Sequence, residues 1–184
     1  KEEDKMGIRA SATAEIIFED CFVPDSARVG KEGRGFMIAM QTLQMSRPVV
    51  AAISVGIAQA AIEAAVAYSH HRKQFGVKIA TFEMVQQMIA DMVMKTEAAR
   101  ILTYKACVAQ MNKDKKAGLY SAMSKCFASD TAMEVTTTAV QVMGGNGYSR
   151  ENPVEKYMRD AKIMQIYEGT NQVQRLVIAN EATF

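Results

Sequence analysis

The chain has 184 residues, of which 49% are hydrophobic and 23% charged, and its formal net charge is +2. These values are ordinary for a globular domain, and they exclude a disordered chain, a collagen-like repeat and a disulfide scaffold. A net charge this small gives no support to nucleic-acid binding.

The first 33 residues differ in character from the rest. The stretch Glu15–Pro24 is rich in β-branched and aromatic residues and ends at a proline, which predicts one or two strands. Two strands alone are marginally stable in water. We therefore interpret residues 1–33 as the end of a β-domain, most of which lies outside this chain.

From residue 34 onward the pattern is helical. We expect helices over about 35–72, 81–113, 119–143, 153–163 and 170–182. Pro48 should kink the first helix, the glycines after Met143 should end the third, and Thr170 should cap the last. Three long and two shorter helices with short connections predict a mainly α fold class, with residues 34–184 as an antiparallel helical bundle.

Two further features bear on the compartment. Residues 49–69 are apolar enough to suggest a membrane span, but Gln59 and Glu63 in their middle favour a buried helix and no membrane span. Cys21, Cys107 and Cys126 have no metal-site spacing. We expect three buried, reduced thiols and no metal site.

One carboxylate, Glu168, lies in a predicted loop just before the last helix. The apolar residues 163–166 precede it, and a carboxylate against apolar walls gains proton affinity and can act as a base. At the helix start, the amides of Gly169 and Thr170 would favour an anion or a developing oxyanion. The alternative is a solvated glutamate near a helix N-terminus.

Three other stretches could contact a ligand. Within 70–76, either basic groups complement the helix dipole with Gly76 as the cap, or Arg72 holds a phosphate while Phe75 stacks on a base. Three glycines within 144–147 indicate a helix cap or a close backbone approach to a ligand or subunit. The charges of 153–162 fit a solvated, ion-paired helix face.

Taken together, four segments resemble the C-terminal part of the acyl-CoA dehydrogenases. They are Arg72–Gly76, Gln141–Gly145, Met158–Lys162 and Tyr167–Thr170. The resemblance covers essentially the whole chain, with residues 1–33 similar to the last strands of that family's middle β-domain. It implies an enzyme that uses FAD to oxidise an acyl-CoA thioester to its trans-2-enoyl form.

The resemblance also implies residue roles. Glu168 would remove the α-proton, Gly169 would line the thioester end, Tyr167 would lie near the substrate and Arg47 would contribute to the CoA site. Residues implied to bind FAD are Arg72, Gln74 and Phe75 toward a neighbouring subunit, Gln141, Gly144 and Gly145 at the adenosine, and Thr170, Asn171 and Gln172 beside the base.

This sequence departs from the family pattern at two positions. Gln44 stands where many members have Asp, and Glu83 stands where many have Gln, so the latter contact to FAD is not carried over. Some members place their base near position 46, where this chain has Ser, so Glu168 indicates the majority type. The family's preceding domains also contact the flavin, and we expect these 184 residues alone to bind FAD weakly and turn over little.

The implied partners are an acyl-CoA substrate, an electron-transfer flavoprotein as acceptor and further copies of the chain, with a homotetramer expected. A bacterial cytoplasm or a mitochondrial matrix suits reduced cysteines. Two alternatives stay open: a flavoenzyme of the acyl-CoA oxidase type, in which oxygen reoxidises the flavin, and a non-catalytic helical oligomerisation module.

Overall fold

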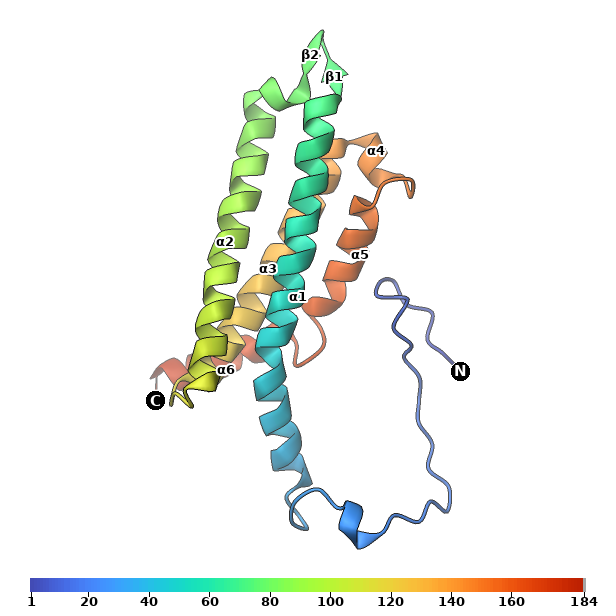
Figure 1. Ribbon diagram of the computed structural model, residues 1–184, viewed down its shortest axis with the longest axis vertical. Coiled ribbons are helices and arrows are strands. Elements are labelled where there is room, and N and C mark those ends of the chain that lie inside the picture. Colours follow the sequence, from blue (N-terminus) through green and yellow to red (C-terminus); the bar gives the residue numbers. More distant parts are fainter. Residues whose placement is uncertain (184) are drawn as a thin grey trace.

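Four antiparallel helices form the body of the molecule (Figure 1). A computed structural model describes residues 1–183. Its elements are η1 (Asp25–Ala27), α1 (Gly35–His71), β1 (Lys73–Gln74), β2 (Val77–Lys78), η2 (Ile79–Thr81), α2 (Glu83–Met111), α3 (Ala117–Met143), α4 (Gly145–Tyr148), α5 (Val154–Met164) and α6 (Asn171–Thr183). Helices α1, α2, α3 and α5 alternate in direction, and α6 crosses one end of the bundle. The predicted mainly α fold class is confirmed.

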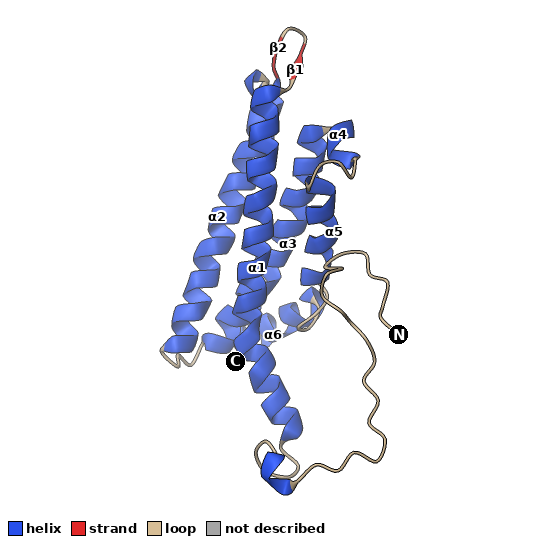
Figure 2. Cartoon of the chain, turned by 45° about the vertical axis from the view of Figure 1, so that its right-hand side comes forward, coloured by secondary structure: helices blue, strands red, loops and turns tan. Residues whose placement is uncertain are grey.

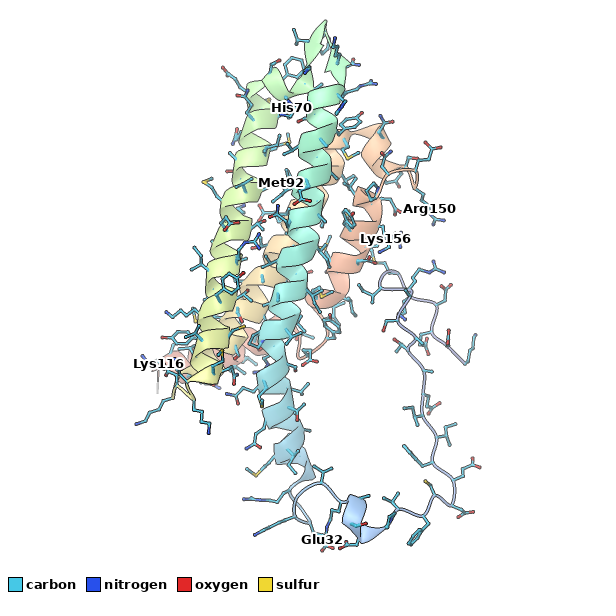
Figure 3. The ribbon with its side chains drawn as sticks, in the orientation of Figure 1. Glu32, His70, Met92, Lys116, Arg150 and Lys156 are labelled. Atoms are coloured by element: carbon cyan, nitrogen blue, oxygen red, sulfur yellow. The ribbon has the colours of Figure 1, made fainter. Side chains whose placement is uncertain are left out.

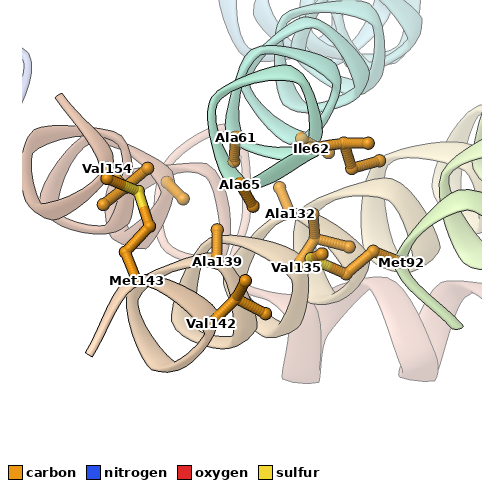
Figure 4. Close-up of a cluster of buried hydrophobic side chains, with 12 residues drawn as sticks. Ala61, Ile62, Ala65, Met92, Ala132, Val135, Ala139, Val142, Met143 and Val154 are labelled. Carbon is orange, nitrogen blue, oxygen red and sulfur yellow. The ribbon is translucent and has the colours of Figure 1, made fainter. Parts of the chain in front are cut away.

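Small side chains let α1 and α3 approach closely. Buried alanines on one face of α1, spaced by seven, three and four residues, meet buried alanines of α3. All are at most 1% exposed, and they are Ala51, Ala58, Ala61 and Ala65 against Ala128, Ala132 and Ala139. Figure 4 shows Met92 of α2 and Val154 of α5 closing the sides of this contact. This close packing of α1 on α3 fixes the position of one end of the bundle relative to the other.

Helix α1 bends near Pro48, where a kink was predicted. Pro48 has no N–H to donate to the carbonyl of Gln44. Gln110 of α2 supplies the missing donor, with its Nε2 at 3.1 Å from the Gln44 oxygen and 2.8 Å from Ser121 Oγ. Figure 2 shows the N-terminal part of α1 leaving the axis of the remainder. A side chain of a neighbouring helix therefore stabilises the bend.

Helix α1 meets the length and hydropathy of a membrane-spanning helix, and within residues 1–183 it is the only helix that does. It packs along α2, α3 and α5 over most of its length. It is a helix of the bundle, as predicted.

The N-terminal segment begins beside α5 and then runs outside the bundle to the start of α1 (Figure 1). The strands expected over 15–24 do not form there, because no sheet partner lies beside them, and Ile16, Phe18 and Phe22 are exposed. A single antiparallel bridge joins Glu2 to Ala14. Near the start of the segment, the Ile8 N–H donates to Asp160 Oδ1 at 2.6 Å.

The cysteines differ from the prediction in their burial. Cys126 is buried in α3, but Cys107 is only half-buried and Cys21 is exposed. All three are free thiols. The expectation of three buried thiols therefore holds for Cys126 alone, and it fails most clearly for Cys21, whose segment has no packed surface beneath it.

Candidate functional site

The predicted ligand-binding residues gather at two ends of the bundle. At one end, the turn after α1 and the turn after α3 line a common cavity of about 440 Å³. Arg72, Gln74 and Phe75 line one side, and Gly144 and Gly145 line the other. Gln141 is exposed on the last turn of α3 and does not line the cavity. Its carbonyl accepts the Gly144 N–H at 3.1 Å.

A tight hairpin presents Phe75 to solvent. Strands β1 and β2 pair in antiparallel register, and the two residues between them are both left-handed, with φ of 52° at Phe75 and 82° at Gly76. Two-residue hairpin loops require this geometry, and glycine adopts it readily. Gly76 is therefore a hairpin residue, and the interpretation as a helix cap is wrong. Phe75 is 93% exposed, with the edge of Phe82 nearby.

Arg72 lies at the C-terminal end of α1, beside this aromatic ring. Its guanidinium makes no hydrogen bond or ion pair within the described chain. Gly144 has a φ of 60°, and a Cβ at Gly144 or Gly145 would meet nothing within 4 Å. An available cation, an open aromatic face and accessible backbone fit a ligand that carries a diphosphate and an aromatic base.

The three glycines of the turn after α3 differ in what surrounds them. A Cβ at Gly147 would lie 2.6 Å from the Val140 carbonyl oxygen, so Gly147 is required for close packing of α4 on α3. Gly144 and Gly145 instead leave backbone open toward the cavity. The helix-cap interpretation therefore applies to Gly144, the C-cap residue of α3, whereas Gly147 serves a contact within the chain that neither interpretation named.

The opposite end of the bundle carries Glu168, in the loop between α5 and α6. Ser46 of α1 donates its Oγ–H to Glu168 Oε2 at 2.6 Å. Glu168 has a φ of 59° and Gly169 a φ of 85°, two successive left-handed residues. For a residue with a Cβ this conformation costs about 1–3 kcal/mol and persists only where surrounding contacts enforce it. The carboxylate is therefore held in a strained turn against α1.

Arg47 lies beside Glu168 and has an unused donor. Its Nε is buried without a hydrogen-bond partner in the described residues. Burial lowers the pKa of Arg47, although the charges of Glu168 and Glu181 oppose this effect. Buried donors are rarely left unpaired, so this N–H is suited to an acceptor on a ligand. Tyr167, the next side chain, donates to Met164 Sδ at 2.8 Å.

Two fully buried polar side chains hold the backbone of the strained turn. Lys125 of α3 is 0% exposed, and its Nζ donates to the Gly169 carbonyl at 2.9 Å and to Asn171 Oδ1 at 2.8 Å. Gln174 of α6 is also 0% exposed, and its Nε2 donates to the carbonyls of Glu168 and Gly169 at 3.1 and 3.0 Å. Neither residue was predicted from the sequence. One signal could have indicated that Lys125 is buried: it lies on the same helical face as Ala122, Ala128 and Ser129.

The residues after Glu168 form a second hollow. Thr170, Asn171 and Gln172 line a space of about 510 Å³ with Asp130 and Arg175. Thr170 caps α6 as predicted, since its Oγ1 accepts the Val173 N–H at 3.3 Å. The Asn171 amide is 3% exposed and donates to Ser129 Oγ and Asp130 Oδ1.

The hairpin end and the Glu168 end are far apart. Ser46 and His71 are about seven turns apart on α1, which is about 37 Å at 1.5 Å per residue. In Figure 3, His70 lies near the hairpin and Lys116 at the other end of the bundle. A group of His, Cys, Asp or Glu able to hold a metal ion is absent from residues 1–183.

Comparison with known proteins matches the chain over nearly its full length. Residues 33–183 match the family model described as acyl-CoA dehydrogenase, C-terminal domain. The chain is 54% identical over 177 residues to the probable acyl-CoA dehydrogenase FadE25 of Mycobacterium tuberculosis, covering 96% of this chain and 46% of that protein. It is 48% identical over 179 residues to the mitochondrial short-chain specific acyl-CoA dehydrogenase of Mus musculus, covering 97% and 43%.

Solved structures give the same result. The butyryl-CoA dehydrogenase of Megasphaera elsdenii superposes with a TM-score of 0.97 at 50% identity, covering 100% of this chain and 48% of that one. The chain thus spans about half the length of the relatives it matches.

Proposed function

This chain belongs to the acyl-CoA dehydrogenase family, and we propose that it forms the C-terminal part of an FAD-dependent enzyme that oxidises an acyl-CoA thioester to trans-2-enoyl-CoA. Residues 1–33 would complete a middle β-domain, and 34–184 would form the helical domain. The observation that carries the proposal is Glu168, held in a strained turn against Ser46 and beside Arg47.

Glu168 is the proposed base that takes the substrate α-proton. Its Oε2 accepts from Ser46, whereas Oε1 has no hydrogen bond within the described chain and is available to take a proton. The backbone N–H of Glu168 is likewise unpaired there and can donate to the thioester oxygen as negative charge develops. Losing one such donor typically costs about 2.7–4 kcal/mol of transition-state stabilisation.

The substrate and the cofactor would contact residues on both sides of this base. Arg47 would bind an acceptor in the CoA part of the substrate, Gly169 would line the thioester end and Tyr167 would lie near the substrate. Bound FAD supplies the hydride acceptor for the β-carbon. Thr170 and Gln172 would contact it near the base, while Asn171, whose amide is used internally, would act by positioning its neighbours.

Two copies of the chain would build one cofactor site. Arg72, Gln74, Phe75, Gln141, Gly144 and Gly145 would hold the diphosphate and adenosine, but they lie about 37 Å from the base along α1, farther than one FAD extends. A second copy must therefore supply them. We propose a homotetramer, with an electron-transfer flavoprotein as acceptor, in a bacterial cytoplasm or mitochondrial matrix.

Glu168→Gln tests the base assignment. The substitution keeps the size of the side chain and its contact with Ser46, but it removes the basic oxygen. In the holoenzyme that contains this chain, exchange of the acyl-CoA α-proton with D₂O, followed by NMR, should fall below detection. The exposed Glu151→Gln is the matched control and should exchange like the wild type. Exchange that persists in Glu168→Gln would show that another residue is the base.

The wild-type holoenzyme also distinguishes a dehydrogenase from an oxidase-type flavoenzyme and from a non-catalytic helical module. Reoxidation of the substrate-reduced enzyme by oxygen, with oxygen uptake matching product formation, would indicate the oxidase type. A colourless protein whose melting temperature is unchanged by added FAD would indicate a non-catalytic helical module.

A further inference from the structure

The buried amine of Lys125 needs an explanation other than stability. A lysine removed from water is costly, and apolar side chains of similar volume often replace buried charges without loss of stability. The Lys125 Nζ has no carboxylate in hydrogen-bond contact, because its two partners are the Gly169 carbonyl and the Asn171 side-chain oxygen. Burial lowers the pKa of Lys125 to about 8; nearby Cys126, Asp130 and Glu168 raise it and Arg47 lowers it.

The two contacts of Lys125 lie at the second residue of the strained turn and at the start of α6. Gly169 directly follows Glu168, and Asn171 begins α6. Gln174 reaches the same turn from α6 and donates to both the Glu168 and Gly169 carbonyls. Fully buried donors therefore fix both carbonyls of the left-handed pair: Gln174 of α6 bonds to each of them, and Lys125 of α3 bonds to that of Gly169. A left-handed glutamate persists only where such contacts enforce it.

We propose that Lys125 and Gln174 are positioning residues that hold Glu168 in its left-handed conformation and so aim its carboxylate at the substrate. This inference rests on the proposed function of Glu168. Neither side chain touches the carboxylate itself, so each acts through the backbone of the turn. Residues of α3 and α6 thus determine where the Glu168 carboxylate points, and Ser46 of α1 donates the hydrogen bond to that carboxylate.

Lys125→Met tests the proposal in the holoenzyme. Methionine matches the length and volume of lysine but cannot donate a hydrogen bond. Because a misplacement of about 1 Å can cost about 100-fold, kcat for α-proton exchange should fall about 100-fold, while the acyl-CoA dissociation constant changes by less than about threefold. A crystal structure of the variant should show Glu168 outside the left-handed region and without its bond to Ser46.

Gln174→Met gives a second variant that is expected to fold. The Oε1 of Gln174 is buried with no partner in the described chain, so the substitution removes an orphaned acceptor together with the two donated bonds. We expect a kcat loss in the same direction with unchanged acyl-CoA binding. Thr136→Val is the matched control, because it removes a buried hydroxyl of α3 whose bonds stay within that helix. It should leave kcat unchanged.

The outcomes are distinguishable. If the wild type and Glu168→Gln behave alike, the proposed function fails. If Glu168→Gln is inactive but both Met variants exchange like the wild type with Glu168 still left-handed, the positioning role is wrong. If Thr136→Val loses kcat as much as Lys125→Met does, the effect is a general consequence of disturbing α3, and the positioning role is likewise overturned.

Discussion

At the scale of single residues, the buried amine of Lys125 should couple folding to pH. Its pKa of about 8 in the folded chain lies below the value near 10.4 of an unfolded lysine. Between these values the unfolded state binds more protons, so stability rises with pH. The free energy of unfolding of the wild type, relative to Lys125→Met, should increase from pH 7 to 10 by up to about 3 kcal/mol, as measured by urea titration.

The exposed Lys115→Met provides the control for that titration. Its difference from the wild type should be flat over the same pH range, because the Lys115 side chain is exposed to water in the folded chain as it is in the unfolded one. A flat difference for Lys125→Met as well would show that Lys125 is hydrated in the folded chain.

The exposed residues of the proposed site could be predicted from the sequence, whereas the buried residues that support them could not. Glu168, Arg72 and Phe75 belong to short local motifs, so their types and spacing were informative. Lys125 is separated from Gly169 by 44 positions, and its role exists only once the loop folds back on α3. Likewise, no local pattern placed Ser46 against Glu168, because that contact joins positions 122 apart.

At the scale of helices, the bend of α1 depends on a donor from α2. Gln110→Leu should leave the Gln44 carbonyl, freed by Pro48, without its partner and destabilise the fold by about 1–3 kcal/mol. In a Pro48→Ala background the residue-48 N–H can bond to Gln44, so the same substitution should cost less. A double-mutant cycle from chemical denaturation measures the difference. Equal costs in both backgrounds would show that Gln110 acts elsewhere, through its bond to Ser121 for instance.

Helix positions were predictable because periodicity and end signals are local. The first helix was expected to end at Arg72 and ends at His71, and the third ends at Met143 as predicted. The hairpin at Lys73–Lys78 was not predicted, since each strand has two residues and no alternating pattern can appear in so short a run. The strand expected over 15–24 needs partners that this chain does not supply.

At the scale of the whole molecule, the exposed apolar face of α2 supports association. Val93, Met94, Ile101, Tyr104 and Val108 are 43–67% exposed on one chain. Exposed apolar side chains gathered on one helix face mark an interaction site. Together with the separation of the two proposed half-sites along α1, it favours an assembly in which each copy lends residues to another.

Mixing two inactive variants tests that assembly. Glu168→Gln lacks the proposed base and Arg72→Ala lacks the proposed diphosphate contact, so each homo-oligomer should be inactive or cofactor-poor. Co-expressed, they should recover dehydrogenation, because some sites pair an intact Glu168 with an intact Arg72 from another copy. Glu168→Gln mixed with the Glu168→Gln/Arg72→Ala double variant should not recover. Absence of recovery in the first mixture would show that each site is built within one chain.

The unbroken length of α1 has one more consequence. Each residue added to an α-helix rotates the chain beyond it by about 100° and advances that chain by about 1.5 Å. A one-residue insertion between Ser46 and His71 would therefore rotate the hairpin around the bundle relative to the strained turn. Four inserted residues would return the hairpin to within about 40° of its original azimuth while lengthening the molecule. The screw geometry of this one helix thus sets the direction in which the hairpin faces relative to Glu168.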